Sequence, residues 1–138
     1  MKTRISWEEY ALKIAKVASE RSQDPYKRVG ACALDHFNRV IGAAYNGLAP
    51  GIAVDDNFWE NREARLPYII HAEANLLSLI KRGKCKLLAC TLLPCSSCAS
   101  MISAYGIKKV VYIDLYHRDT QALNIFKFNN IECIQYNI

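Results

Sequence analysis

The stretch His71-Ala72-Glu73, followed by Pro94-Cys95-Ser96-Ser97-Cys98, constrains the fold of this 138-residue chain more than any other part of its sequence. Its imidazole and two thiols supply three of the four ligands of a tetrahedral zinc ion and leave the fourth position to water. A structural zinc site normally closes with a fourth protein ligand, so the pattern favours a catalytic metal. The alternative is a zinc knuckle in which Glu73 only begins a helix, and Pro94 before the first cysteine argues against it.

The spacing of these residues predicts where they lie on helices. Cys95 and Cys98 are three residues apart, so in a first helical turn both sulfurs face the same side, where the helix N-terminus favours thiolates. His71 and Glu73 would point about 200° apart in the middle of a helix. We therefore expect His71 at the start of its helix, and two helix starts converging on one metal ion.

Outward from this stretch, apolar periodicity and turn residues predict alternating helices and strands. Helices are expected over residues 7–21, 71–83, 95–105 and 119–129. Strands are expected over residues 29–34 and 39–45, which form a hairpin, and over 87–92, 109–114 and 131–136. Residues 46–68 are expected to form a long loop, which inside a compact domain is usually functional. Together they predict one α/β domain over residues 1–138, with three layers and a mixed sheet.

Composition and charge narrow the class of protein. Hydrophobic residues make up 51% and charged residues 22%, as in ordinary globular domains. The sequence has no apolar run long enough to span a membrane, and residues 1–5 lack a signal-peptide stretch, so we expect a cytoplasmic protein. The net charge of +5 is modest and spread along the chain, without interleaved aromatic residues. We therefore do not expect a nucleic-acid partner.

Six cysteines would permit disulfides, but their uneven spacing and the cytoplasmic expectation argue against them. Cys32, Cys90 and Cys133 lie in apolar, strand-like runs and are expected to be small buried hydrophobic residues. Cys85 follows a basic turn, where we expect a free surface thiol. Only the remaining two cysteines have a spacing that indicates chemistry.

The metal motif also predicts a reaction. His-x-Glu followed by Pro-Cys-x-x-Cys resembles the signature of zinc nucleobase deaminases. Zinc lowers the pKa of bound water towards about 7 and supplies hydroxide at neutral pH. Glu73 is placed to take the proton of that water, pass it to a ring nitrogen and later protonate the departing amine. The expected chemistry is hydrolytic deamination, in which hydroxide attacks the amidine carbon of a base and ammonia leaves.

Several blocks outside the metal motif carry a closer resemblance. They are Ser22-Gln23-Asp24-Pro25, Val29-Gly30-Ala31-Cys32, Tyr45-Asn46-Gly47, Asp55-Asp56, Trp59, Pro67-Tyr68, Gly106-Ile107-Lys108-Lys109-Val110 and Tyr116-His117. In this order they resemble the deoxycytidylate (dCMP) deaminases of the cytidine and deoxycytidylate deaminase superfamily, from about Trp7 to Tyr136. The resemblance implies a cytidine-deaminase-like three-layer α/β/α fold around a mixed five-stranded sheet. It also implies conversion of dCMP to dUMP and ammonia, which supplies thymidylate synthesis.

The resemblance implies roles for individual residues. His71, Cys95 and Cys98 would bind one zinc ion per chain, and Glu73 would be the proton shuttle. Asn46 would hydrogen-bond the deoxyribose, and the backbone of Ala72 would meet the pyrimidine carbonyl. Members of this family are typically homohexamers that dCTP activates and dTTP inhibits, with Mg²⁺ accompanying the regulatory triphosphate. That nucleotide would bind near Gly42, Ala44, Tyr45, Asn46 and Asp55.

Two departures from the family concern regulation. This chain has Gly42-Ala43-Ala44 where the family commonly has Gly-x-Gly, and the methyl group of Ala44 could crowd a phosphate. The loop after Tyr45-Asn46-Gly47 is also one residue out of step with the usual Pro-x-Gly spacing. Catalysis is expected to survive both changes, whereas allosteric control is not assured.

Other residues have two interpretations each. Ser22, Lys27 and Arg28 could hold a 5′-phosphate, or Arg28 could be simple surface charge. Tyr116 could stack on the base or pack at a strand end. Asp55 and Asp56 could order the long loop or help hold Mg²⁺.

The remaining aromatic and histidine side chains are expected to be structural. Phe58 and Trp59 could cover the pocket, although anchoring the loop is the commoner role. We expect His36 to be an exposed turn residue and His117 a surface or interface group rather than a fourth zinc ligand.

Three other functions compete with dCMP deamination. A deaminase of dCTP, or of both nucleotides, would use the same machinery. A tRNA or polynucleotide deaminase would need a basic, aromatic-lined channel for a flipped base. A non-catalytic dNTP sensor would keep zinc as a structural ion, but it would have no need of Glu73.

Overall fold

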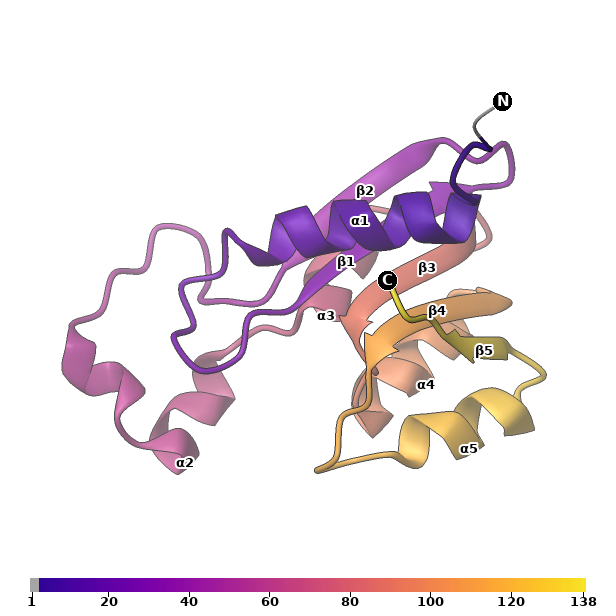
Figure 1. Cartoon of the computed structure of the whole chain (residues 1–138). Coiled ribbons are helices and arrows are strands. Elements are labelled where there is room, and N and C mark those ends of the chain that lie inside the picture. Colours follow the sequence, from indigo (N-terminus) through magenta and orange to yellow (C-terminus); the bar gives the residue numbers. More distant parts are fainter. Residues whose placement is uncertain (1–2) are drawn as a thin grey trace.

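A mixed five-stranded sheet forms the centre of the computed structural model, which describes residues 3–138 (Figure 1). The strands are β1 (Gly30–Asp35), β2 (Val40–Tyr45), β3 (Cys85–Leu92), β4 (Lys109–Asp114) and β5 (Glu132–Gln135), in the sheet order β2-β1-β3-β4-β5. β1 is antiparallel to both of its neighbours, whereas β3, β4 and β5 are parallel to one another. The predicted mixed sheet is therefore confirmed. Residues 1 and 2, part of the segment expected to lack a signal peptide, lie outside the described residues.

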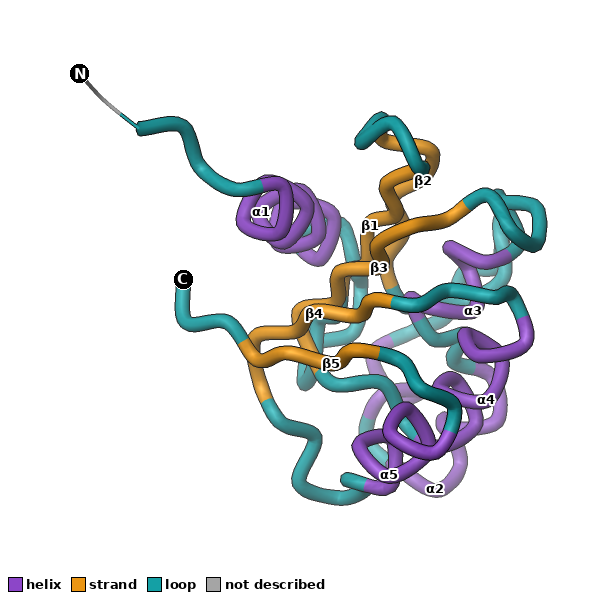
Figure 2. Tube along the Cα trace, turned by 90° about the vertical axis from the view of Figure 1, so that its right-hand side faces the viewer, coloured by secondary structure: helices purple, strands orange, loops and turns teal. Residues whose placement is uncertain are grey.

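Helices cover both faces of this sheet. The helices on its faces are α1 (Trp7–Ser19), α3 (Ala72–Leu77), α4 (Ser96–Ala104) and α5 (Gln121–Phe128), whereas the short helix α2 (Arg62–Arg65) lies in the long loop. Figure 2 shows α1 on one side of the sheet and α3, α4 and α5 on the other. This arrangement confirms the three-layer α/β/α fold.

The alternation of side chains along β1 divides the core between the two faces. Cys32 and Leu34 pack with residues of α1, whereas Ala31 and Ala33 belong to the cluster that α3, α4 and α5 cover. All six residues of β1 are buried, as expected of a strand inside three layers. α1 also lies unusually close to β1, since a Cβ added to Gly30 would be 1.8 Å from the carbonyl oxygen of Ala15.

Most of the predicted elements differ from their expected boundaries by one or two residues at an end, and one helix differs by more. The helix expected over residues 71–83 ends at Leu77 and continues as turns. There the Ser78 hydroxyl donates to the carbonyl of Asn75 at 2.6 Å, a side-chain bond that competes with the helical pattern. The strand expected from residue 87 begins at Cys85, which pairs with Asp35 of β1.

This earlier start of β3 corrects the prediction for Cys85. Cys85 is buried in the core, and burial raises the pKa of its thiol to about 12, so it is not a free surface thiol. Cys32 and Cys90 are buried as predicted, whereas Cys133 is only half-buried. All six cysteines of the sequence are free thiols.

The long loop predicted over residues 46–68 contains three short helical turns, η1 (Asp56–Trp59), α2 and η2 (Leu66–Tyr68). Two backbone hydrogen bonds between Gly47 and Ile70, at 3.0 and 2.7 Å, tie its two ends together. The Asp55 side chain caps η1 by accepting the Phe58 N–H at 3.3 Å. In Figure 1 this segment extends away from the sheet, beside the carboxyl end of β3. None of the helices in residues 3–138 has the length and apolar character needed to cross a lipid bilayer.

Candidate metal centre and active site

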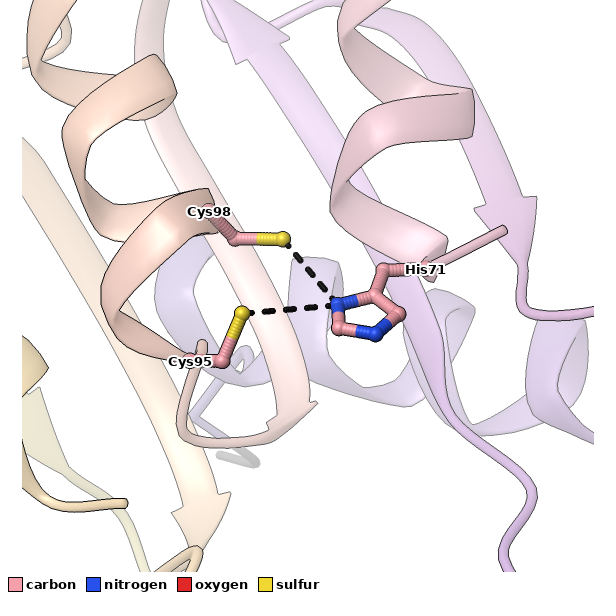
Figure 3. Close-up of side chains that lie close together, drawn as sticks. All are labelled: His71, Cys95 and Cys98. Carbon is pink, nitrogen blue, oxygen red and sulfur yellow. Dashed lines mark hydrogen bonds between the residues drawn. The ribbon is translucent and has the colours of Figure 1, made fainter. Parts of the chain in front are cut away.

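The three predicted metal ligands come together at the starts of two helices (Figure 3). His71 precedes α3 and Cys95 precedes α4, each with an extended backbone as its helix's N-cap residue, and Cys98 lies in the first turn of α4. The Nδ1 atom of His71 is 3.3 Å from the Cys98 sulfur and 3.4 Å from the Cys95 sulfur. The predicted convergence of two helix starts is confirmed.

This donor set fits zinc in both chemistry and spacing. Zinc–sulfur bonds of about 2.3 Å and zinc–nitrogen bonds of about 2.0 Å, at tetrahedral angles, place sulfur and nitrogen about 3.5 Å apart. The distances of 3.3 and 3.4 Å are close to that value, and all three ligand atoms lie within 4.8 Å of one another. Small outward movements would complete three corners of a tetrahedron.

The pKa values of the two thiols are shifted in opposite directions. The Cys98 side chain, and then His71, lower the pKa of Cys95 to about 4 by hydrogen bonding to its thiolate. The same hydrogen bond, together with burial, raises the pKa of Cys98. The cluster therefore carries a thiolate on Cys95, and binding of a metal ion would displace the proton from Cys98.

Glu73 lies in the first turn of α3, with only 4% of its surface exposed. Burial raises its pKa, while the Cys98 side chain and the nearby charge of His71 act in the opposite direction. A buried carboxyl beside the metal ligands, with its pKa moved towards neutrality, has the properties of a general acid and base.

A cavity of about 510 Å³ opens beside the metal site, and its volume is within the usual range for small-molecule sites. His71, Glu73 and Cys95 lie on its wall next to apolar side chains from β3 and from the segment after β4. Three of the predicted substrate-binding residues, Asn46, Ala72 and Tyr116, also line it. Their individual roles remain predictions.

The side chain of Asn46 has a clear structural role. Its amide oxygen accepts the Val29 N–H at 2.9 Å, and its amide nitrogen donates to the Lys27 carbonyl at 2.9 Å. It therefore fixes the segment before β1 against the end of β2. Asn46 is buried and lines the cavity, so any contact with a ligand would use its remaining hydrogen-bonding capacity.

Ser22 and Arg28, the predicted phosphate ligands, do not line this cavity. The Ser22 hydroxyl is buried, donates to the Asn46 carbonyl at 2.8 Å and accepts the Asp24 N–H at 3.2 Å. Arg28 is exposed outside the cavity. These positions favour a structural role for Ser22 and the surface-charge interpretation for Arg28.

Three arginines that were not predicted from the sequence also line the cavity, namely Arg62, Arg65 and Arg118. Arg62 and Arg65 lie in α2, within the segment predicted as loop, and their spacing of three residues is the signal that could have paired them. Arg118 follows directly on Tyr116 and His117. Lys27, which was considered as a phosphate ligand, also lines the cavity.

Of the residues predicted for regulation, Asn46 lines the cavity, whereas Gly42, Ala44, Tyr45 and Asp55 do not. Gly42, Ala44 and Tyr45 are in β2, and Ala44 is buried in the core cluster that includes Leu76 of α3. The Ala44 methyl group therefore packs into the core of this chain, so the suggested crowding of a phosphate has no support. Asp55 orders the long loop, as one of its two interpretations proposed.

The remaining side chains follow the structural interpretations. Phe58 and Trp59 pack against each other with ring centroids 5.0 Å apart, and neither lines the cavity. His36 is exposed, with its ring 3.0 Å from the Gly83 carbonyl. His117 is exposed at the cavity and does not belong to the metal cluster.

A three-layer α/β/α fold with this open histidine and cysteine site is the architecture of the zinc-dependent deaminases. The chain belongs to the family described as the cytidine and deoxycytidylate deaminase zinc-binding region, whose model matches residues 5–114.

Among its relatives are enzymes named deoxycytidylate deaminase. The human one is 34% identical over 128 residues, which cover 86% of this chain and 71% of that protein. The one from Mycobacterium phage D29 is 33% identical over 126 residues, which cover 80% of this chain and 96% of that protein. Among solved structures, dCMP deaminase from the cyanophage S-TIM5 in complex with dCMP and dUMP matches with a TM-score of 0.81 and 25% identity. That match covers 98% of this chain and all of the other.

Proposed function

We propose that this chain is a dCMP deaminase that hydrolyses dCMP to dUMP and ammonia. The observation that carries the proposal is a metal site and a buried carboxyl in one cavity that four basic side chains also line. The metal site and Glu73 provide for deamination of an aminopyrimidine, and the basic side chains provide for a phosphate. Relatives named deoxycytidylate deaminase, and the phage enzyme solved with dCMP and dUMP, support the same substrate and product.

Each part of the cavity has a task in this reaction. When bound, zinc supplies Lewis acidity, which makes water a nucleophile near neutral pH. Glu73 accepts one proton from the attacking water and delivers it to the ring nitrogen next to the reacting carbon. It then takes the remaining proton of the added hydroxyl and passes it to the amine, which leaves as ammonia while the carbonyl forms. The backbone of Ala72 and the side chain of Asn46 hold the pyrimidine carbonyl and the deoxyribose. The ring of Tyr116 stacks on the base.

The raised pKa of Glu73 suits this role. A carboxyl at its usual pKa would hold the transferred proton poorly at neutral pH. Burial raises the pKa of Glu73 and so brings the free energies of its charged and neutral forms closer together. A group poised in this way can both take and return a proton in one catalytic cycle.

The basic side chains favour a nucleotide over a nucleoside. The Arg65 guanidinium is already held in place, since it donates to the Trp59 carbonyl at 2.8 Å and lies 4.4 Å from the centre of the Tyr26 ring. Arg62 has only a 3.5 Å contact with the highly exposed Glu63. Guanidinium groups match phosphate oxygens with paired N–H donors. Together with Lys27 and Arg118, these side chains would bind the 5′-phosphate.

The proposal extends to location, assembly and regulation. Six free thiols support a reducing compartment such as the cytoplasm. Exposed apolar side chains on α1 and beside β2, including Val17, Val40 and Leu79, support association with other copies, in line with the expected homohexamer. Activation by dCTP and inhibition by dTTP with Mg²⁺ rest on the resemblance to the family. Addition of each triphosphate to the dCMP assay would test them.

The test of the main proposal is ammonia release by the zinc-loaded protein from deoxycytidine, dCMP, CMP and dCTP. We expect dCMP to have the highest kcat/KM. Arg118→Gln and Arg62→Gln are expected to lower kcat/KM for dCMP about 10-fold or more, because charge-assisted hydrogen bonds are worth about 1.5–3 kcal/mol each. Turnover of deoxycytidine should hardly change in these variants.

Arg28→Gln is the matched control, since Arg28 carries the same charge outside the cavity. Higher turnover of dCTP than of dCMP would identify the triphosphate as the substrate. Deoxycytidine turned over as well as dCMP would contradict the role of the basic side chains. If the protein released ammonia from none of the four compounds, the proposal as a whole would be contradicted.

A further inference from the structure

One carboxylate connects the start of α4 with the segment that follows β4. The Oδ2 atom of Asp119 accepts the backbone N–H of Ser96 at 2.8 Å, and its Oδ1 atom accepts the N–H of Gln121 at 3.0 Å. Ser96 is the first residue of α4 and follows the zinc ligand Cys95 directly. Asp119 is therefore joined by hydrogen bonds to the helix that carries two of the three metal ligands.

The first turn of α4 needs such a partner because of what precedes it. An N-cap residue commonly satisfies the first N–H groups of a helix with its own side-chain oxygen. Here the N-cap residue is Cys95, whose sulfur points towards His71 and makes no capping hydrogen bond. The carboxylate of Asp119 instead satisfies the N–H of the first helical residue, and its hydrogen bonds from Ser96 and Gln121 hold its own pKa low.

The same residue ends a stretch of the cavity wall. Leu115, Tyr116, His117 and Arg118 all line the cavity and lead directly into Asp119. The Asp119 N–H donates to the Tyr116 carbonyl at 3.1 Å, which closes a turn around the two residues between them. Residues 115–118 are thus tied at one end to β4 and at the other to the start of α4.

We propose that Asp119 is a positioning residue. It fixes the position of Cys95 relative to residues 115–118 of the cavity wall, and so sets both the zinc affinity and the binding of phosphate. The carboxylate fixes the first peptide of α4, and that peptide fixes the direction of the Cys95 side chain. Hydrogen-bonded groups that orient metal ligands in this way typically change metal affinity 10- to 100-fold when removed. The metal part of the proposal depends only on the zinc site, whereas its phosphate part rests on the proposed function.

The test is the zinc affinity of the 138-residue chain, measured by competition with a chromophoric chelator, for Asp119→Ala and Asp119→Asn. We expect about 10- to 100-fold weaker zinc binding in Asp119→Ala. Asp119→Asn should be intermediate, because an amide oxygen can accept one of the two N–H groups. The matched control is Asp114→Ala, which removes an exposed carboxylate at the end of β4, five residues away.

A second variant separates metal positioning from simple stabilisation of α5. Ser96→Pro deletes the N–H that Asp119 accepts at α4, together with the Ser96 hydroxyl, whereas the bond from Gln121 to Asp119 remains. Proline is tolerated at the first position of a helix, and Cys95 already has the extended backbone that must precede it, with φ −71° and ψ 171°. Ser96→Ala controls for the lost hydroxyl.

We expect Ser96→Pro to weaken zinc binding as Asp119→Ala does, and the double variant to be little worse than either single one. In the cobalt-loaded protein, both variants should also shift the sulfur-to-metal charge-transfer absorption. Unchanged zinc affinity in folded Ser96→Pro and Asp119→Ala would overturn the proposal, as would a lowered Tm with zinc affinity intact. Because these readouts need no turnover, their failure is distinct from failure of the dCMP assay.

Discussion

Glu73→Gln is the sharpest test of the proposed chemistry, because it changes the proton-carrying group and little else. Glutamine has almost the same volume and can occupy the same buried site, but it cannot accept and return a proton. General acid and base catalysis contributes about 10²- to 10⁴-fold to a rate. At 1.36 kcal/mol per tenfold, the loss corresponds to about 2.7–5.4 kcal/mol of activation free energy. We therefore expect kcat for dCMP to fall by that factor.

Zinc binding and stability are expected to remain. The three ligand atoms come from His71, Cys95 and Cys98, so the variant should still hold one zinc ion per chain. Burial disfavours the charged form of Glu73, as its raised pKa shows, so a neutral amide should cost no stability. A Tm equal to or above that of the parent protein is the expected result.

The assay combines zinc content, thermal unfolding and ammonia release from dCMP, with Glu20→Gln as the control on an exposed carboxylate at the end of α1. A zinc-loaded Glu73→Gln protein with near-normal turnover would refute the proton-shuttle role. Loss of zinc from the variant would show instead that Glu73 helps to hold the metal.

Three further predictions concern the metal and the fold. Cys98→Ala is expected to lose zinc and to unfold at a lower temperature, while Cys133→Ala keeps its zinc; a stable zinc-loaded Cys98→Ala protein would disprove the ligand set. Gly30→Ala is expected to lower the free energy of unfolding by about 1–3 kcal/mol or more in urea, because α1 must move away from β1 to admit the methyl group; unchanged stability would contradict that close approach. Partial burial opposes the charge on Glu8, but its 3.1 Å hydrogen bond from Lys109 prevails, so the pKa of Glu8 is lowered and that of Lys109 raised. Their pair should stabilise the fold by less than about 1 kcal/mol above the usual Glu pKa of 4.5, and this contribution should vanish as pH falls through the lowered pKa of Glu8 or rises through the raised pKa of Lys109. The free energies of unfolding of the parent protein and of Glu8→Gln, compared across pH 3–8, measure this contribution. A difference between them that grew towards low pH would contradict the prediction.

Residue spacing was sufficient to predict the metal centre, because the relevant geometry is local. Cys95 and Cys98 share one helical turn, and the pair His71 and Glu73 can face one pocket only at a helix start. The apolar periods likewise predicted the order of helices and strands, since each depends on residues within a few positions of one another. Errors arose at the ends of elements. At Leu77 a local hydrogen bond from the Ser78 hydroxyl to the Asn75 carbonyl competes with the helical pattern, whereas at Cys85 pairing with the neighbouring strand β1 extends β3.

The sequence alone therefore predicted the three side chains of the candidate metal site and the three-layer class of fold, and it singled out Glu73, which the structure buries beside that site. Only the tertiary structure decided which basic side chains line the cavity. Arg62 and Arg118 are far apart in sequence. They line the same cavity only because of how their two separate loops pack against the rest of the fold. The same holds for the hydrogen bond between Asp119 and Ser96, which joins residues 23 positions apart. Contacts of this kind are set by the packing of whole layers, and no short window of sequence contains that information.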